Sequence, residues 1–243
     1  MRIAICGRNL DDLRRHLAAF PVEVDPANPE LVISYGGDGS LLGAEREFPG
    51  VPKCPLRDSR STPQCPQHRE ASVLGQLFEG RLARSVMGKL QAIRDGRRLV
   101  ALNDISINRF SVASAVRYRL WLDDELYATQ VVGDGLVVAT PFGSTGYYRS
   151  ITHSLFRIGI GLAFNNSTEP INHLVIGDRS RIRVQIVRGP ALLAADNDPA
   201  HLRLEKGDTV EIARDESNAV LVGLDVFRCR ACFALRQGRE NPE

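Results

Sequence analysis

The sequence contains no apolar run long enough to span a bilayer, which argues against a helical membrane anchor within it. The stretch at residues 1–6, Met-Arg-Ile-Ala-Ile-Cys, is too short and too soon interrupted by polar residues for a signal peptide. We expect this stretch to form a first β-strand instead. The expectation is a cytoplasmic protein without a membrane partner.

The chain is also poor in excess charge and in cysteine. Its 31 Lys and Arg residues nearly balance 29 Asp and Glu residues, and the net charge of +2 gives no support for nucleic-acid binding. Five cysteines, an odd number, argue against a disulfide framework. With 243 residues and 43% hydrophobic residues, the chain is long enough for one large domain or two medium ones.

The cysteines nevertheless leave one alternative open. Cys229 and Cys232 are three residues apart, as are Cys65 and His68, and this is the spacing of zinc ligands. Two such pairs from distant parts of the chain would make a structural zinc site. Buried or incidental thiols explain the same spacing, because residues three apart are common in amphipathic segments. Both interpretations remain open at this stage, and we assign no metal ligand from the sequence.

The N-terminal third predicts alternating strands and helices. Leu10, Leu13 and Leu17 share one face of a helix after the first strand, and the apolar residues 31–34 read as a buried strand. Residues 48–66 are rich in proline and predict a loop, and residues 70–79 predict a helix. We therefore expect an α/β domain over residues 1–97, with an open, mostly parallel sheet and flanking helices.

After Gly80 the pattern changes to short alternating apolar segments. These predict strands at residues 126–132, 135–139, 173–176, 181–187, 191–195 and 208–213. Such spacing is typical of an all-β domain. We expect this second domain over residues 98–223, with the boundary near residues 95–99.

A glycine-rich turn follows the second apolar strand, with the sequence Gly36-Gly37-Asp38-Gly39-Ser40. Glycines allow the backbone to turn tightly and to approach a ligand, and the helix start that follows favours an anion. The turn therefore indicates either a phosphate site or a structural turn. Arg57 and Arg60 in the proline-rich loop are candidate phosphate contacts, although solvated loop charges are the more common role of such arginines.

Two later stretches carry polar groups in apolar surroundings. Asn103 and Asp104 interrupt a strand, so they indicate either a ribose-binding pair or a strand-end turn satisfied by backbone amides. Residues 133–150 combine a Gly-Asp-Gly turn, a small-residue loop and the adjacent Tyr147 and Tyr148. This density of turns, hydroxyls and aromatic rings favours a nucleotide site.

Taken together, these three stretches resemble the NAD kinase family. The matching segments are Gly36-Gly37-Asp38-Gly39-Ser40, then Asn103-Asp104, then Gly133-Asp134-Gly135-Leu136, and finally Thr140-Pro141-x-Gly143-Ser144-Thr145-Gly146-Tyr147. The resemblance implies an α/β N-terminal domain and a β-rich C-terminal domain, with residues 224–243 returning to the first domain. It also implies phosphoryl transfer from ATP or polyphosphate to the 2′-hydroxyl of the adenosine ribose of NAD, which gives NADP.

The resemblance assigns roles residue by residue. Asp38 is the catalytic carboxylate, and a divalent cation, most often magnesium, accompanies the donor phosphates. The implied substrate-binding residues are Gly37, Gly39, Asn103, Asp104, Asp134, Thr145, Gly146, Tyr147 and Ser150. The family commonly forms dimers or tetramers, so we expect a homo-oligomer.

The sequence departs from the family pattern at several points. Ser40 replaces threonine, Asp104 replaces glutamate, Phe142 replaces a small residue and Gly146 replaces alanine. A glycine-rich segment of the family is replaced by the loop at residues 52–66, which leaves the phosphoryl donor and the choice between NAD and NADH open. A Gly-x-x-x-x-Gly-Lys-Ser/Thr loop is absent from the sequence. Two alternatives stay in view: a lipid or small-metabolite kinase, and a catalytically silent dinucleotide-binding regulator.

Overall fold

The computed structural model of the protein describes residues 1–238 and separates into two compact units. Unit 1 consists of Met1–Met87 together with the described chain from Ala219 onward, and unit 2 is Gly88–Asn218. The chain passes between the units inside strands β5 (Arg84–Arg94) and β16 (Thr209–Val222). Of the sequence region 224–243, residues 239–243 lie outside the described residues. Within the described chain, no helix combines the length and apolar character needed to cross a membrane.

Unit 1 is built on a parallel sheet. Its strand order is β2-β1-β3-β4, and each neighbouring pair is parallel. The strands are β1 (Arg2–Gly7), β2 (Glu23–Val24), β3 (Leu31–Tyr35) and β4 (Lys53–Leu56), and the end of β16 pairs with β4 through Leu221 and Lys53. All five residues of β3 are buried, as expected for a strand covered on both faces.

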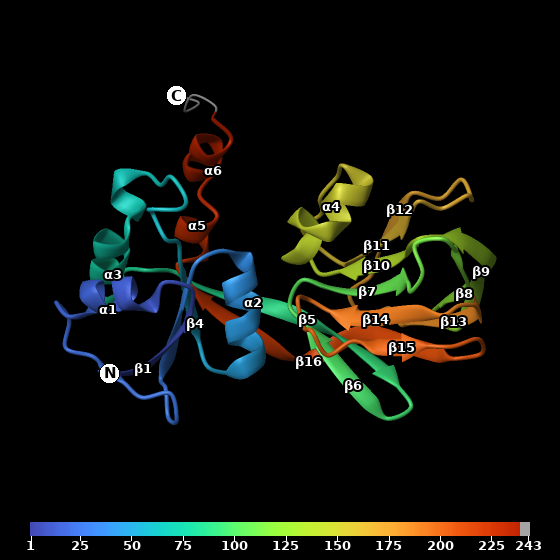
Figure 1. The fold of residues 1–243 in the computed structure, drawn as a ribbon, viewed down its shortest axis with the longest axis horizontal. Helices are drawn as coiled ribbons and strands as arrows, with labels where there is room; N and C mark the ends of the chain where they lie inside the picture. The colour runs from blue at the N-terminus through green and yellow to red at the C-terminus, as the bar shows by residue number, and fades with distance from the viewer. Residues whose placement is uncertain (239–243) are drawn as a thin grey trace. The chain divides into compact units, whose positions relative to one another are not determined.

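Helices cover both faces of this sheet (Figure 1). Helices α1 (Leu10–Leu17) and α3 (Glu70–Phe78) share one apolar cluster with the strands, and α2 (Asp38–Glu47) packs through Ala44 on Ala4 and Val32 of the opposite face. A short 3₁₀ helix, Pro66–His68, precedes α3, and the C-terminal segment adds α5 (Leu224–Phe227) and α6 (Arg230–Arg236). Successive β1 residues pack into different clusters, Ile3 and Ile5 on the side of α1 and α3 and Ala4 and Cys6 on the side of α2, so the sheet needs helices on both faces.

One expectation for unit 1 was wrong. Residues 48–66 were expected to be loop throughout, yet Lys53–Leu56 form the buried strand β4. Proline usually weakens a strand because it lacks a backbone N–H. Here Cys54 and Leu56 are almost fully buried in the core of unit 1, so packing outweighs the cost of Pro55.

Unit 2 is a sandwich of two β-sheets. The first sheet has the order β12-β11-β10-β7-β14-β15, and the second contains β9, β8, β13, the first part of β16 and the β5–β6 hairpin. The strands are β6 (Arg97–Ala101), β7 (Asp104–Arg109), β8 (Val116–Leu122), β9 (Glu125–Gly133), β10 (Gly135–Ala139), β11 (Ile160–Asn165), β12 (His173–Ile176), β13 (Ile182–Arg188), β14 (Ala191–Ala195) and β15 (Leu202–Leu204). The alternating residues of both sheets meet in one large apolar core.

The structure confirms the predicted fold class, an α/β region followed by a β-rich region. It also adds a helix that the sequence did not predict. After the 3₁₀ helix Gly143–Thr145, the chain forms α4 (Tyr147–Thr152) on the outer face of the first sheet. Tyr148 packs there on Val137, Ala139 and Ala163, so this helix depends on a tertiary contact rather than on a repeating apolar pattern.

Candidate functional site

The glycine turn of unit 1 places Asp38 at the first position of helix α2. Gly36 has φ 134°, and a Cβ there would lie 2.6 Å from the Ser40 Oγ atom, so the turn requires glycine. The Gly36 amide donates to the Leu56 carbonyl at 2.7 Å, which anchors the turn to β4. Gly37 is the N-cap residue and Gly39 lies in the first helical turn. As a result, the Asp38 side chain is 50% exposed beyond the carboxyl end of β3.

Two guanidinium groups face the Asp38 carboxylate. The Nη2 atoms of Arg57 and Arg228 lie 3.8 Å and 4.0 Å from the Asp38 Oδ1 atom. Burial lowers the pKa of both arginines, and the negative charge of Asp38 partly offsets this effect. Because two cations share one exposed carboxylate, this part of unit 1 can accept an additional anion such as a phosphate.

The position of Arg57 is fixed by the C-terminal segment of unit 1. Its guanidinium lies 3.9 Å from the centre of the Phe227 ring, and its Nε atom donates to the Phe227 carbonyl at 3.3 Å. The sequence reasoning identified Arg57 but missed Arg228, which directly follows Phe227. Arg228 carries no motif of its own, and the adjacent Cys229-x-x-Cys232 pattern was the sole local signal.

Arg60 has a different environment from Arg57. Its guanidinium forms ion pairs with Asp58 at 3.1 Å and Asp12 at 3.2 Å. Burial tends to raise the pKa of Asp58, but hydrogen bonds from Arg60 and Asn9 outweigh it and lower the pKa to about 2. Asp58 is therefore ionised at neutral pH, and the charge of Arg60 is already balanced within the loop.

In unit 2, Asp196 holds the turn formed by residues 102–104, called here the Asn103 turn. The Asp196 carboxylate accepts hydrogen bonds from the backbone amides of all three residues, at 2.7, 2.7 and 3.1 Å. On the other side, the Thr140 hydroxyl donates to the Leu102 carbonyl at 2.6 Å, and the Thr140 amide donates to the Asn103 carbonyl at 2.9 Å. The turn is thus fixed by residues that lie far away in the sequence.

The loop after β10 packs directly against the Asn103 turn. A Cβ at Gly143 would lie 2.0 Å from the Asn103 carbonyl oxygen, so a larger residue does not fit there. The Gly143 amide donates to the Thr140 hydroxyl at 3.0 Å. Within the described residues, the buried Oδ1 atom of Asn103 has no hydrogen-bond partner. It is therefore a free acceptor where the Asn103 turn and the loop after β10 meet within unit 2.

Asp104, the next residue of the same turn, is buried. The residue is 7% exposed. Burial first, and then the negative charge of Asp196, raises the pKa of Asp104 to about 7. A carboxyl group with this pKa is partly protonated at neutral pH. It can then donate a hydrogen bond as well as accept one.

Tyr147 and Ser150 of α4 line a cavity of about 560 Å³ in unit 2. The Tyr147 hydroxyl donates to the Asn108 Oδ1 atom at 3.1 Å and accepts from the Asn165 Nδ2 atom at 3.0 Å. The remaining walls come mostly from β11 and residues 166–172. A cavity of this size with aromatic and amide groups suits part of a nucleotide.

The other predicted residues of unit 2 surround this region without lining the cavity. Asp134 forms an ion pair with Arg109 at 2.9 Å and accepts a hydrogen bond from Asn166 at 2.7 Å. Thr145 and Gly146 are exposed at the end of the 3₁₀ helix that precedes Tyr147. The structure therefore places Asn103, Asp104, Asp134 and the 145–150 segment in one unit, and Asp38, Arg57 and Arg60 in the other.

Comparison with known proteins identifies the family. The family profile described as "ATP-NAD kinase C-terminal domain" matches residues 102–224. An NAD kinase of Burkholderia ambifaria (strain MC40-6) is 31% identical over 218 residues, which cover 82% of this chain and 70% of the relative. The chain belongs to the NAD kinase family. A second relative, the NAD kinase of Teredinibacter turnerae, is 29% identical over 209 residues and covers 79% of this chain and 71% of its own length.

Solved structures of the NAD kinase family have the same fold. Yeast NADH kinase in complex with NADH superimposes with a TM-score of 0.79 at 18% identity and covers all of this chain and 89% of its own chain. An NAD kinase from Archaeoglobus fulgidus in complex with ATP has a TM-score of 0.74 at 19% identity, covering 98% of both chains. None of these relatives favours the alternatives of a lipid kinase or a silent regulator.

The residues around Asp38 do not fit a magnesium ion. Among residues 1–238, neither of the side-chain groups with enough close ligand atoms for a metal ion includes Asp38. The nearest charged partners of Asp38 are two guanidinium groups, which repel a cation. Magnesium usually binds one or two carboxylates together with substrate phosphates. The chain itself therefore offers no magnesium cage at this point.

Proposed function

We propose that this chain is an NAD kinase that transfers a phosphoryl group from ATP, or from polyphosphate, to the 2′-hydroxyl of the adenosine ribose of NAD. The observation that carries the proposal is the half-exposed Asp38 carboxylate with Arg57 and Arg228 within 4.0 Å. It combines a proton acceptor with two groups that bind phosphate. Family membership supplies the substrate class.

The chemistry asked of Asp38 is modest. Phosphoryl transfer requires mainly alignment and charge stabilisation rather than a covalent nucleophile. As the bond between the ribose 2′-oxygen and phosphorus forms and the bond to the leaving oxygen of the donor breaks, Asp38 takes the hydroxyl proton. Arg57 and Arg228 stabilise the negative charge on the transferred group, and the amides of Gly37 and Gly39 bind the donor phosphates.

Unit 2 supplies the dinucleotide-binding residues in this proposal. The free Oδ1 atom of Asn103 accepts a hydrogen bond from a ribose hydroxyl, and Asp104, the next residue, accepts or donates according to its protonation. Asp134, Thr145, Gly146, Tyr147 and Ser150 bind the rest of NAD. The complexes of related kinases with NADH and with ATP support these two substrate classes.

Three further points belong to the proposal. The donor phosphates carry the divalent cation, expected to be magnesium, because the residues around Asp38 do not hold it. Arg60 is a weaker candidate for phosphate binding than Arg57 because two carboxylates neutralise it. We also expect a cytoplasmic homo-oligomer, a dimer or tetramer, and light scattering after gel filtration measures the oligomeric state.

One assay tests the proposal. The pure protein is incubated with NAD or NADH, magnesium, and ATP or polyphosphate, and NADP or NADPH is measured with a dehydrogenase specific for the phosphorylated cofactor. We expect NADP formation with at least one donor. Lipid phosphorylation without NADP, or calorimetric NAD binding without turnover for any donor, would overturn the proposal.

A further inference from the structure

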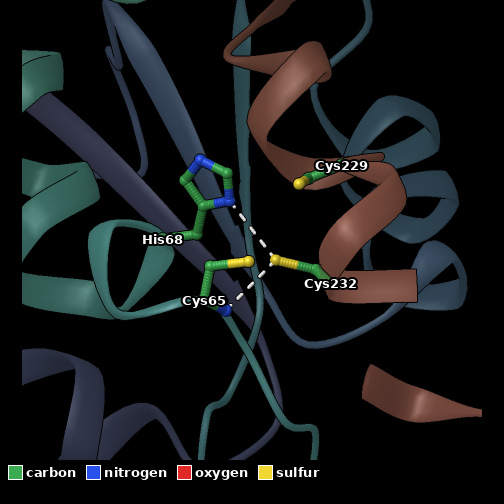
Figure 2. Close-up of side chains that lie close together, drawn as sticks. All are labelled: Cys65, His68, Cys229 and Cys232. Atoms are coloured by element: carbon green, nitrogen blue, oxygen red, sulfur yellow. Dashed lines mark hydrogen bonds between the residues drawn. The ribbon is translucent and has the colours of Figure 1, made fainter. Parts of the chain in front are cut away.

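Four metal-binding side chains converge in unit 1, away from Asp38. Figure 2 shows Cys65 and His68 facing Cys229 and Cys232, and the four ligand atoms all lie within 4.8 Å of one another. The His68 Nδ1 atom lies 3.3 Å from the Cys232 Sγ atom. Cys65 and Cys232 are buried, while His68 and Cys229 are half-buried. We refer to these four residues as the thiol cluster.

The thiol cluster consists of two ligand pairs, and both pairs have the same kind of local backbone. Cys65 directly precedes the 3₁₀ helix Pro66–His68, and Cys229 directly precedes α6. In each case the second ligand comes three residues later, on the same side of a helical turn, so that both side chains of a pair point to one centre. The two pairs are separated by more than 150 positions of sequence, and the fold brings them together.

Two groups of the loop contact the same sulfur atom of the C-terminal segment. The Cys65 amide donates to the Cys232 Sγ atom at 3.3 Å, and the His68 Nδ1 atom lies at the same distance from that atom. The two ligand pairs therefore meet at one sulfur atom, and cysteine sulfur is a usual zinc ligand.

We propose that Cys65, His68, Cys229 and Cys232 bind one zinc ion as a structural Cys₃His site. Tetrahedral coordination with three thiolates and one imidazole is a common form of structural zinc site. With zinc–sulfur bonds of about 2.3 Å, ligand sulfur atoms lie roughly 3.8 Å apart, so the observed cluster needs only a small contraction. Zinc requires no redox partner here, and binding releases the thiol protons to solvent.

The zinc ion ties the loop after β4 to the C-terminal segment of unit 1. The loop carries Arg57, and the segment carries Phe227 and Arg228 immediately before Cys229. Both arginines face Asp38, and Arg57 stacks on Phe227. The metal therefore positions the guanidinium pair. This consequence rests on the proposed function, whereas the metal site itself does not.

A second group of close ligand atoms, Asp12, His16 and Glu70, lacks this character. Asp12 already forms ion pairs with Arg15 at 2.7 Å and Arg60 at 3.2 Å. Glu70 accepts hydrogen bonds from the Ser59 amide and hydroxyl, both at 2.7 Å. Arginines therefore neutralise Asp12, and Ser59 already occupies both oxygen atoms of Glu70, so the thiol cluster is the stronger site.

Metal content provides the direct test. The full chain, purified under reducing conditions with zinc in the medium, is dialysed and analysed by inductively coupled plasma mass spectrometry. We expect one zinc per chain in the wild type and a loss of zinc in Cys229→Ser/Cys232→Ser. The control Cys6→Ser changes a half-buried cysteine outside the cluster and should keep the metal. A metal-free wild type, or equal zinc in the double variant, would overturn the proposal.

Cobalt gives a second readout that does not depend on activity. Replacing zinc with Co²⁺ should produce the thiolate-to-cobalt charge-transfer bands and intense visible bands of a tetrahedral site. His68→Cys should keep the metal with a shifted spectrum, because the site becomes Cys₄, and this variant serves if the double serine variant does not fold. An octahedral-type spectrum, or a Cys65–Cys232 disulfide in the purified chain, would contradict a zinc site.

Activity assays distinguish the zinc-site proposal from the kinase proposal. Chelation of zinc should raise the KM for the phosphoryl donor more than the KM for NAD, and zinc should restore the original value. Stoichiometric zinc without NADP formation would leave the metal site in place and refute the kinase proposal. NADP formation by a chain that never binds zinc would do the reverse.

Discussion

The two polar turns of this molecule are built in opposite ways. The turn at Asp38 exposes its carboxylate, which lies beside two guanidinium groups and has only loose ion-pair distances. The Asn103 turn buries the Asp104 carboxylate, and the partly buried Asp196 carboxylate accepts three of its backbone amides at 2.7–3.1 Å. The first arrangement leaves a charge free to meet a substrate, and the second uses a charge to hold the backbone.

The two turns therefore have different roles: the Asp38 turn presents a reactive group, and the Asn103 turn holds the backbone in position. A hydrogen bond to a charged group contributes roughly 1.5–3 kcal/mol, so losing the three acceptor contacts of Asp196 affects folding. An exposed ion pair contributes at most about 1 kcal/mol, so removing the Asp38 charge leaves folding nearly unchanged. A substitution of Asp38 should therefore lower activity, whereas a substitution of Asp196 should lower folding stability.

The largest effect is expected for Asp38→Asn. Removal of the proton acceptor should lower kcat by about 10²–10⁴-fold, while NAD binding and thermal stability stay close to wild type. Steady-state NADP formation and calorimetry measure the two quantities. Asp11→Asn changes an exposed acid on α1 and is the matched control. Wild-type turnover in Asp38→Asn would remove this carboxylate from the mechanism.

Asp196→Ala should lower the folding stability of unit 2. Loss of its carboxylate leaves three backbone amides without their acceptor, and we expect a loss of about 2–5 kcal/mol in the unfolding free energy of unit 2, with weaker NAD binding. Trp121, the single tryptophan of the chain, lies in unit 2 and reports its urea unfolding by fluorescence. Exposed Asp178→Ala is the control. Equal stability of the two variants would contradict the role of Asp196.

The same contrast explains what the sequence could predict. The Asp38 turn is local, since glycines, one acid and a helix start are adjacent, and it was visible as a motif. The strands of unit 2 were visible because apolar and polar residues alternate. Arg228 lies beside Asp38 and Asp196 binds the amides of residues 102–104, and no pattern in the sequence shows such contacts between distant residues.

Two elements were hidden for a related reason. Strand β4 has an unfavourable proline, and its burial between β3 and β16 decides its conformation. Helix α4 is six residues long, too short for a detectable apolar period, and is held by Tyr148 on the sheet. The local sequence predicts a helix or strand when local interactions determine its conformation. It does not predict elements such as β4 and α4, whose conformation is determined by tertiary packing.

Asp104 connects stability to pH. Burial and Asp196 raise its pKa from 3.8 to about 7, so between these values the folded chain keeps a proton that the unfolded chain has released. Stability from this group therefore falls as pH rises from about 4 to about 7. Asp104→Asn should flatten the decline by about 1–3 kcal/mol in Trp121-monitored unfolding. Asp178→Asn should leave it unchanged, and a decline equal to wild type in Asp104→Asn would place the titration elsewhere.

The smallest effect is expected for Arg228→Gln, which tests one of the two guanidinium groups at Asp38. Arg228→Gln removes one of two charges, so we expect the KM for the phosphoryl donor to rise about tenfold, equivalent to about 1.4 kcal/mol, with the KM for NAD nearly constant. Exposed Arg230→Gln, two residues further on, is the control and should behave like wild type. Equal donor KM values in both variants would show that Arg228 has no role in phosphate binding.

Arg57→Gln should cost more than Arg228→Gln, because Arg57 also stacks on Phe227 and binds its carbonyl. The two substitutions act on one anion site, so their effects on donor KM should not add in the double variant. Additive effects would mean that the arginines contact different phosphates, and the shared carboxylate of Asp38 would then connect two separate subsites. The double-mutant cycle thus determines whether the charged turn of unit 1 binds the donor as one site.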